Sequence, residues 1–123
     1  HLNPQNVGRS YRYLYIGVAD QPQGNAPLQS ILKRDLTTGE ESIWSFAPRG
    51  FAGEPIFVPR PGGTAEDDGW VLGQFYNAAR RCSELAILDA QHLEQGPVAQ
   101  LKLPHHIPYG LHGSFTQNLV IPA

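Results

Sequence analysis

Two segments of the chain have the same layout: Ser30-Ile31-Leu32-Lys33-Arg34-Asp35, a turn and Ser42-Ile43-Trp44-Ser45-Phe46, and then Glu84-Leu85-Ala86-Ile87-Leu88-Asp89, a turn and Val98-Ala99-Gln100-Leu101-Lys102-Leu103. Each segment predicts a β-hairpin, because two short runs of apolar and β-branched residues flank turn residues. A proline-containing linker follows each hairpin and leads to a new strand, which begins at Gly53-Glu54-Pro55 in the first copy and at Leu111-His112-Gly113 in the second. The repeat therefore indicates one structural unit that is used twice.

The spacing of the repeat favours a β-propeller. His112 follows Glu54 by 58 residues at equivalent points of the two copies, and four-stranded antiparallel units that recur at such a distance are typical of propeller blades. In a propeller the two residues would enter the inner strands of neighbouring blades, side by side near the central axis. A β-sandwich is the alternative. Two blades cannot close a ring, so their outer edges need partners from the same polypeptide or another one.

The rest of the chain also predicts strands, so we expect an all-β fold. The 13 glycines and 11 prolines divide it into short segments that are rich in β-branched and aromatic residues and show no long helical period. The expected strands are Arg12 to Ala19, Leu28 to Asp35, Glu41 to Phe46, Pro55 to Pro59, Gly69 to Tyr76, Ser83 to Asp89, Val98 to Leu103 and Gly113 to Leu119.

The charge balance excludes one class of partner. The 123 residues carry 9 Lys and Arg against 11 Asp and Glu, which gives a net charge of −2. This is not the basic field that would hold nucleic acid through its phosphates. The short charged clusters Glu66-Asp67-Asp68 and Arg80-Arg81 are expected at solvated turns or strand ends.

The cellular location is constrained by what the sequence lacks. Cys82 is the only cysteine, so the chain cannot form an internal disulfide, which favours a reducing, cytoplasmic location. No apolar stretch has the length needed to cross a bilayer, and residues 1–15 are not signal-like. The sequence contains no methionine and opens at His1. We therefore expect it to be a piece of a longer polypeptide.

His112 is the first candidate for chemistry. Gly110 and Gly113 surround it, and glycines let the backbone approach a crowded centre closely, as an imidazole aimed at a metal requires. A lone histidine is also compatible with a buried structural role in which the ring is only hydrogen-bonded. Both readings stay open from the spacing alone.

Glu54 is the second candidate. It lies between Gly53 and Pro55 in apolar surroundings, so its carboxylate needs a partner. A metal-bound histidine commonly donates its other ring N–H to a carboxylate, which orients the ring. An ion pair with Arg49 or Arg60 is the alternative.

The other histidines do not predict a site. His105 and His106 are adjacent and would point to opposite faces of a strand, so we expect them at the surface or in packing contacts. His92 falls in a predicted turn and His1 is the first residue. Cys82 has no convincing histidine partner for nucleophilic catalysis.

Four blocks of the sequence have a recognisable wording, order and spacing. They are Phe51-Ala52-Gly53-Glu54-Pro55-Ile56-Phe57-Val58-Pro59-Arg60, Glu66-Asp67-Asp68-Gly69-Trp70-Val71-Leu72, Ser83-Glu84-Leu85-Ala86-Ile87-Leu88-Asp89-Ala90, and Leu103-Pro104 with Pro108-Tyr109-Gly110-Leu111-His112-Gly113-Ser114-Phe115. Together they resemble the C-terminal region of the carotenoid oxygenase family. Their detail is most similar to the cyanobacterial apocarotenoid oxygenases, and the resemblance runs over nearly the whole chain.

The resemblance implies a seven-bladed propeller in which four histidines bind one Fe(II) on the axis, with glutamates behind them. His112 corresponds to the last of the four histidines, and Glu54 corresponds to one of the supporting glutamates. The other three ligands would lie upstream of this chain. On this basis residues 1–53 form part of one blade, residues 54–104 form the next, and residues 105–123 begin the closing blade of a single domain.

The same resemblance implies a function. The complete protein is expected to cleave a conjugated carbon–carbon double bond of a carotenoid or apocarotenoid with O2 to give two carbonyl products, while this piece alone is expected to be inactive. The partners would be the apolar polyene, O2 and the remainder of the propeller, and the lipid-soluble substrate is compatible with peripheral contact with a membrane. The alternatives are a stilbene-cleaving oxygenase of the same family and a non-catalytic propeller that serves as a binding module.

Overall fold

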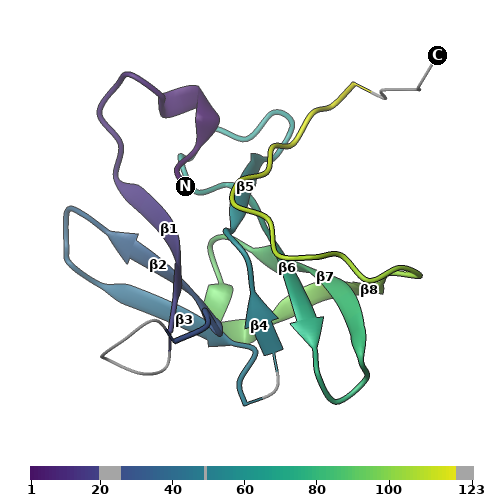
Figure 1. Cartoon of the computed structure of the whole chain (residues 1–123). Coiled ribbons are helices and arrows are strands. Elements are labelled where there is room, and N and C mark those ends of the chain that lie inside the picture. Colours follow the sequence, from purple (N-terminus) through teal and green to yellow (C-terminus); the bar gives the residue numbers. More distant parts are fainter. Residues whose placement is uncertain (20–25, 49, 119–123) are drawn as a thin grey trace.

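The computed structural model describes residues 1–19, 26–48 and 50–118. Within these ranges the chain forms eight β-strands and two single-turn 3-10 helices, η1 (Pro4–Asn6) and η2 (Leu93–Gln95) (Figure 1). All strand pairs are antiparallel. The predicted all-β fold is therefore confirmed.

The first sheet contains β1 (Tyr13–Val18), β2 (Ser30–Asp35) and β3 (Glu41–Ser45) in the order β1-β2-β3. The predicted hairpin is formed by β2 and β3. Its turn is closed by the Asp35 carboxylate, which accepts hydrogen bonds from the backbone N–H groups of Thr37 and Thr38. Gly39 completes the turn with a φ of 79°, a backbone conformation that glycine adopts without steric cost.

The second sheet contains β4 (Gly50–Ala52), β5 (Ile56–Pro59), β6 (Gly69–Asn77), β7 (Cys82–Asp89) and β8 (Pro97–Lys102). Both β4 and β5 pair with β6, so the sheet is four strand positions wide and its first position is interrupted. The interruption is residues 53–55, where Pro55 has no N–H to donate to a ladder. We did not predict β4, because its three residues lie in what the sequence presents as a proline-containing linker.

The two sheets differ in how well their number of strands agrees with the predicted four-stranded blades. The second sheet has the expected width, whereas the first has three strands in the part of the chain that the structure describes. The first sheet lies within residues 1–53, and the second begins at β4 and ends with β8. The blade boundaries at residues 53 and 104 stay predictions.

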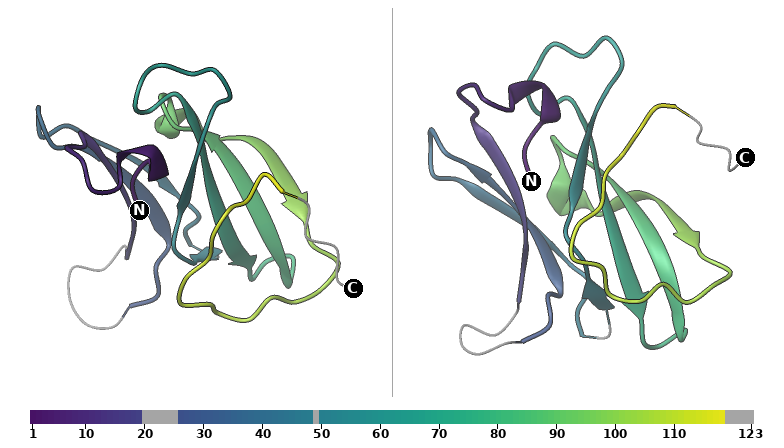
Figure 2. Two further views of the ribbon diagram at one scale, coloured as in Figure 1. Left: turned by 90° about the horizontal axis from the view of Figure 1, so that it is seen from above. Right: turned by 45° about the horizontal axis from the view of Figure 1, so that its top comes forward.

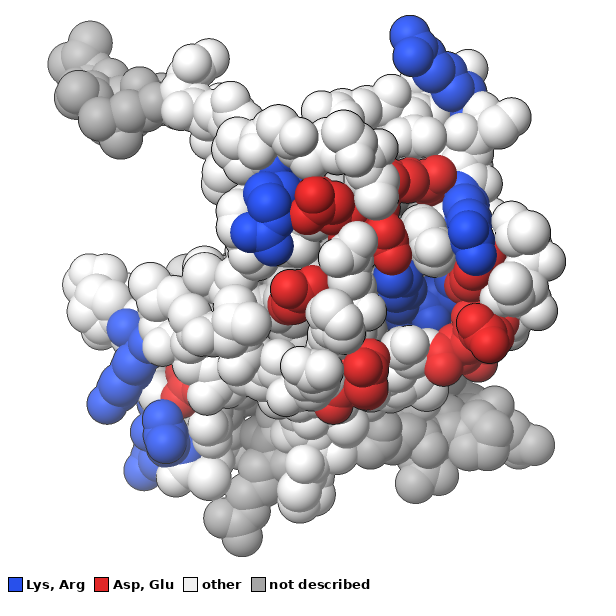
Figure 3. Space-filling model, turned by 180° about the vertical axis from the view of Figure 1, so that it is seen from behind, with Lys and Arg blue, Asp and Glu red and all other residues white. Residues whose placement is uncertain are grey.

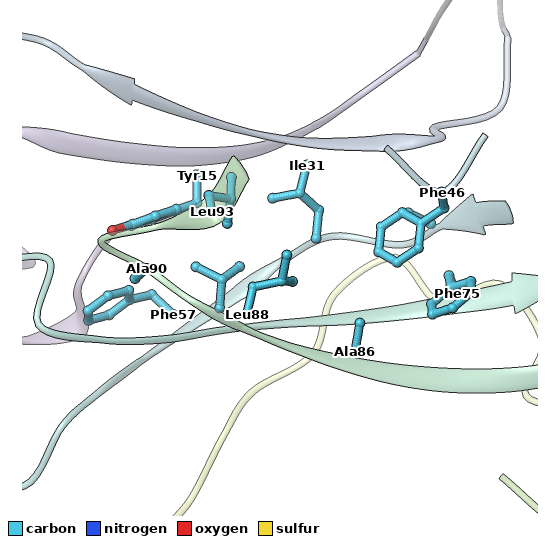
Figure 4. Close-up of a cluster of buried hydrophobic side chains, with 11 residues drawn as sticks. Tyr15, Ile31, Phe46, Phe57, Phe75, Ala86, Leu88, Ala90 and Leu93 are labelled. Atoms are coloured by element: carbon cyan, nitrogen blue, oxygen red, sulfur yellow. The ribbon is translucent and has the colours of Figure 1, made fainter. Parts of the chain in front are cut away.

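The core lies between the two sheets. Figure 4 shows Tyr15 and Ile31 of the first sheet pointing toward Phe57 and Leu88 of the second. The rings of Tyr15 and Phe57 are stacked with their centroids 5.3 Å apart. A Cβ atom added at Gly73 would lie 2.7 Å from Ile31 Cδ1, so a glycine on β6 lets the sheets approach this closely. Burial of each large side chain contributes about 1.5–3 kcal/mol.

The acidic cluster Glu66-Asp67-Asp68 joins segments that lie far apart in the sequence. Glu66 accepts hydrogen bonds from the backbone N–H groups of Arg12 and Tyr13, and Asp67 forms an ion pair with Lys33 at 2.7 Å. Figure 3 shows acidic and basic side chains interspersed on one face of the molecule. The cluster lies at a turn, as predicted, but the expectation that it is solvated is only partly met, because Asp67 is the ionic partner of a nearly buried lysine. Arg80 and Arg81 are exposed, as predicted.

The C-terminal segment, defined here as residues 103–118, leaves β8 and crosses the side of the second sheet that faces away from the first (Figures 1 and 2). Residues 113–118 form no strand, so the prediction of a strand from Gly113 is wrong over this range; Leu119 lies outside the described residues. The physical reason is that a strand pairs with a backbone edge, whereas this segment lies over a face. In the described part of the chain, no helix is long and apolar enough to cross a membrane.

Candidate metal centre

Glu54 lies in the interruption between β4 and β5. On one side of it the Gly53 N–H donates to the Gln74 carbonyl oxygen at 2.9 Å, and on the other side Pro55 is buried. The ladder to β6 resumes at Ile56, which is opposite Leu72. The backbone is therefore held at both ends of the interruption, and the Glu54 side chain, which is 34% exposed, is placed where a regular strand would continue.

His112 meets this carboxylate from the C-terminal segment. Its Nδ1 lies 2.8 Å from Glu54 Oε2. A carboxylate has only acceptors, so the hydrogen of this bond belongs to Nδ1, and the neutral ring then carries its lone pair on Nε2. The His112 side chain is 75% exposed. The pair thus consists of an imidazole that is oriented by a carboxylate and left largely exposed by the described residues.

A cavity of about 150 Å³ adjoins the pair, and its wall includes Glu54, His112 and Gln74. A second, larger cavity of about 430 Å³ lies beside it, and the lining residues common to both include Gln74. The larger cavity is walled mainly by apolar and aromatic side chains, among them Phe51 and Tyr109. The imidazole and carboxylate therefore lie next to a hollow suited to a hydrocarbon.

The histidines predicted to have no part in a site make contacts of their own. The His106 ring packs edge-on against Tyr76, with centroids 5.5 Å apart. His92 Nδ1 lies 3.7 Å from an Asp89 carboxylate oxygen. His1 accepts a hydrogen bond through Nδ1 from the backbone of β5. His106 nevertheless lines the larger cavity, and the His1 N-terminus interacts electrostatically with Glu54. In the described part of the chain, the histidine side chain that hydrogen-bonds Glu54 is that of His112.

The alternative partners of Glu54 can be compared with the contact observed. Arg60 hydrogen-bonds Asp68 through Nε at 2.8 Å and lies 3.9 Å from Asp89. Arg49 lies outside the described residues. The Glu54 carboxylate contacts His112 instead.

The donor set fits one ligand of a metal and its supporting carboxylate. Within residues 1–19, 26–48 and 50–118 there is no group of three or more His, Cys, Asp or Glu side chains that could hold a metal ion. A site with His112 as one ligand must therefore take its other ligands from outside these residues. The carboxylate–histidine arrangement is the one that commonly orients a metal-bound imidazole.

Sequence reasoning missed the surface that surrounds the pair. Gln74 and Leu85 are opposite one another on β6 and β7 and both line the cavity at His112. Strict alternation along the two predicted strands puts these residues on one face of the sheet. The alternation does not tell which segment covers that face, so it could not by itself assign them to the site.

The chain is similar in sequence to proteins of one known family. A model of the family described as retinal pigment epithelial membrane protein (RPE65) matches residues 1–117. The apocarotenoid-15,15'-oxygenase of Synechocystis sp. is 63% identical over 116 residues, which are 94% of this chain and 24% of that protein. The lignostilbene-alpha,beta-dioxygenase isozyme III of Sphingomonas paucimobilis is 38% identical over 88 residues, covering 72% of this chain and 18% of that protein.

Solved structures agree with the sequence comparison. The crystal structure of cobalt-substituted Synechocystis apocarotenoid oxygenase matches with a TM-score of 0.90 and 62% identity, over 95% of this chain and 24% of that one. The chain thus spans about a quarter of the length of these relatives. A family model that covers nearly every residue, together with this identity and this structural match, shows that the chain belongs to the RPE65/carotenoid oxygenase family.

Proposed function

We propose that this chain is part of a non-haem iron(II) oxygenase that cleaves a conjugated carbon–carbon double bond of a carotenoid or apocarotenoid with O2, giving two carbonyl products. The observation that carries the proposal is the 2.8 Å contact between His112 and Glu54 beside an apolar cavity. It is supported by 63% identity to a protein named apocarotenoid-15,15'-oxygenase.

In this proposal His112 would hold iron through Nε2, and three further histidines would come from the part of the protein that precedes this chain. Four neutral imidazoles leave the ferrous ion its full positive charge, unlike sites with two histidines and one carboxylate. Iron(II) would supply the centre at which O2 is activated. Glu54 does not bind the metal; it accepts the Nδ1 hydrogen and so fixes the tautomer and orientation of the His112 ring.

The apolar lining of the larger cavity supports the proposal of a polyene substrate rather than a polar one. Phe51, Phe75 and Ile107 contribute to its wall, and the described lining contains no acidic or basic side chain except His106. A hydrocarbon that enters such a hollow releases water from apolar surface on both sides, at about 25 cal/mol per Å². The binding energy of a carotenoid would thus come from burial rather than from hydrogen bonds.

We also propose that the two sheets belong to the last blades of a seven-bladed propeller. The boundaries would be residues 1–53 for a partial blade, 54–104 for a complete one and 105–123 for the beginning of the closing blade. The exposed apolar side chains of the C-terminal segment, Leu111 at 83% and Tyr109 at 69%, support further coverage by the rest of the protein. A cytoplasmic location with peripheral membrane contact stays part of this proposal.

The proposal is tested by His112→Ala in the complete protein, with His92→Ala as the control because His92 is a surface residue of the same chemistry. We expect His112→Ala to lose bound iron and polyene cleavage, and His92→Ala to keep both. Iron content is measured by elemental analysis and cleavage by the loss of polyene absorbance. Normal iron occupancy in His112→Ala would refute the ligand role, and a protein that binds no iron in any form would favour the non-catalytic binding module.

A stilbene-cleaving oxygenase is the second candidate, because the lignostilbene dioxygenase relative is 38% identical over 88 residues. The higher identity to the apocarotenoid oxygenase favours the polyene. Assay of the complete protein on an apocarotenoid and on a hydroxystilbene, at equal concentration, separates the two. A larger kcat/KM for the stilbene would overturn the substrate class while leaving the metal site intact.

A further inference from the structure

The C-terminal segment that carries His112 is attached to the second sheet at a small number of points. It has no strand ladder of its own, and residues 104–118 are all exposed. Its first residue, Leu103, donates its backbone N–H to the Ser83 carbonyl oxygen at 2.9 Å. Four residues later the Ile107 N–H donates to the Ser83 hydroxyl, also at 2.9 Å. One residue of β7 therefore holds the segment twice.

Ser83 is placed for this contact by the alternation of the sheet. On β7, Ala86 and Leu88 point into the core, whereas Ser83 and Leu85 point to the other face, over which the C-terminal segment runs. Ser83 is only 1% exposed because the segment covers it. A hydroxyl at this position therefore gives the outer face of the sheet a buried acceptor for a backbone N–H of the segment.

A second contact lies directly beside the first. Tyr76 of β6 is the cross-strand neighbour of Ser83. The Tyr76 ring packs edge-on with His106, and the Ser83 hydroxyl accepts from the next residue, Ile107. The cross-strand pair thus contacts two consecutive residues of the segment: the Tyr76 ring contacts the His106 ring, and the Ser83 hydroxyl binds the Ile107 backbone.

The anchor lies close to His112 along the chain. His112 follows Ile107 by five positions, and a chain of that length spans at most about 17 Å. Pro108 follows the anchored residue directly, and its ring fixes one backbone dihedral of this short link. The position of the imidazole relative to Glu54 therefore depends on where the segment is held at Ile107.

We propose that Ser83 is a positioning residue for His112: its hydroxyl holds the Ile107 backbone and so sets the path that delivers the imidazole to Glu54. This inference rests on the proposed function, since it concerns the same metal ligand. It goes further because it assigns a role to a serine that touches neither the metal ligand nor its carboxylate.

The test uses the complete protein and Co(II) as the probe, since Co(II) absorption in the visible range reports coordination geometry. Ser83→Ala removes only the hydroxyl. Ser45→Ala is the matched control, because Ser45 Oγ likewise accepts a backbone N–H, from Ala47 at 3.1 Å, but belongs to the first sheet. His112→Ala is included to test the ligand itself. For each variant we would measure Co(II) affinity, the Co(II) spectrum, the melting temperature, and hydrogen exchange of the peptide that contains Ile107.

We expect Ser83→Ala to speed hydrogen exchange at Ile107, to weaken Co(II) affinity about fivefold, as loss of one buried hydrogen bond would, and to shift the Co(II) spectrum. Ser45→Ala should leave affinity and spectrum unchanged. If His112→Ala loses Co(II) but Ser83→Ala matches Ser45→Ala in affinity and spectrum, the positioning role is overturned and the proposed function stands. If His112→Ala retains Co(II) binding and spectrum, the proposed function itself fails.

Discussion

His112 Nδ1 lies 2.8 Å from Glu54 Oε2, a contact that joins residues 58 positions apart. It exists because a strand is interrupted. Were β4 and β5 one continuous strand, residue 54 would be held in the ladder to β6; instead Gly53 is bonded to Gln74 and the ladder resumes at Ile56. The interruption therefore places the Glu54 carboxylate where the C-terminal segment crosses the sheet.

Replacement of Glu54 by Gln in the complete protein should weaken iron affinity about 10- to 100-fold, because the amide is a poorer acceptor for the His112 Nδ1 hydrogen than a carboxylate. The fold should be unaffected, since the Glu54 side chain is partly exposed. Iron affinity by competition with a chelator, and the melting temperature, provide the measurements.

Glu41→Gln is the control for this substitution, because Glu41 pairs with Arg34 at an exposed position of the first sheet. It removes the same charge without contact with His112. Equal iron affinity in the Glu41 and Glu54 variants would show that Glu54 is an ordinary surface carboxylate.

Replacement of Lys33 by Met should destabilise the protein by about 3 kcal/mol, since it leaves a nearly buried carboxylate without its partner. The Lys33 ammonium lies 2.7 Å from Asp67 and 2.8 Å from the Ala90 carbonyl oxygen, and both side chains of the ion pair are less than 15% exposed. Urea unfolding of the complete protein measures the change.

The neighbouring Arg34 offers a matched comparison, because its ion pair with Glu41 is about half exposed on both sides. Arg34→Met should cost less than about 1 kcal/mol. If the variants at positions 33 and 34 unfold at the same urea concentration, the Lys33 contacts across the two sheets contribute no more than a surface pair.

The Arg12–Asp35 pair should make stability fall in acid. The Arg12 guanidinium hydrogen-bonds both carboxylate oxygens of Asp35, and this contact, with the backbone N–H groups of Thr37 and Thr38, holds the pKa of Asp35 well below its usual value. Because the folded pKa is below the unfolded value of about 3.9, the stabilisation is present above that value and is lost as the pH falls toward the folded one.

Asp35→Asn therefore should lower the melting temperature at pH 7, and the difference from the unsubstituted protein should narrow as the pH falls below about 4. Melting curves of both proteins between pH 7 and pH 3 provide the comparison. A difference that stays constant over this range would mean that the ionisation of Asp35 makes no contribution to stability.

Much of the secondary structure could be predicted from local patterns. The hairpin of β2 and β3 and the hairpin of β7 and β8 lie where the repeat predicted them, within one or two residues at each end. The alternation along β7 also separates the core face from the outer face, as Leu88 illustrates by being fully buried. These features depend on neighbours in the sequence, so local reasoning reaches them.

Three features could not be predicted in this way. The strand β4 is three residues long and is formed only because β6 offers an edge at Tyr76 and Phe75. The acidic cluster has inter-sheet partners that are distant in the sequence, such as Lys33. The residues after Gly113 have the composition of a strand, but they cross a face that offers no edge to pair with. In each case the deciding partner is remote along the chain.

By itself the sequence determined that this chain forms antiparallel β-sheet from a repeated hairpin, and its resemblance to a family pointed to His112 and Glu54. These features follow from strand alternation, turn residues and sequence motifs, which are local properties of the chain. Only the tertiary structure decided that an interrupted strand and a strand-free segment bring these two side chains to 2.8 Å, and that Ser83 holds the segment on its path. The physical reason is that hydrogen bonds between distant residues depend on how the sheets pack, and packing is a property of the whole fold.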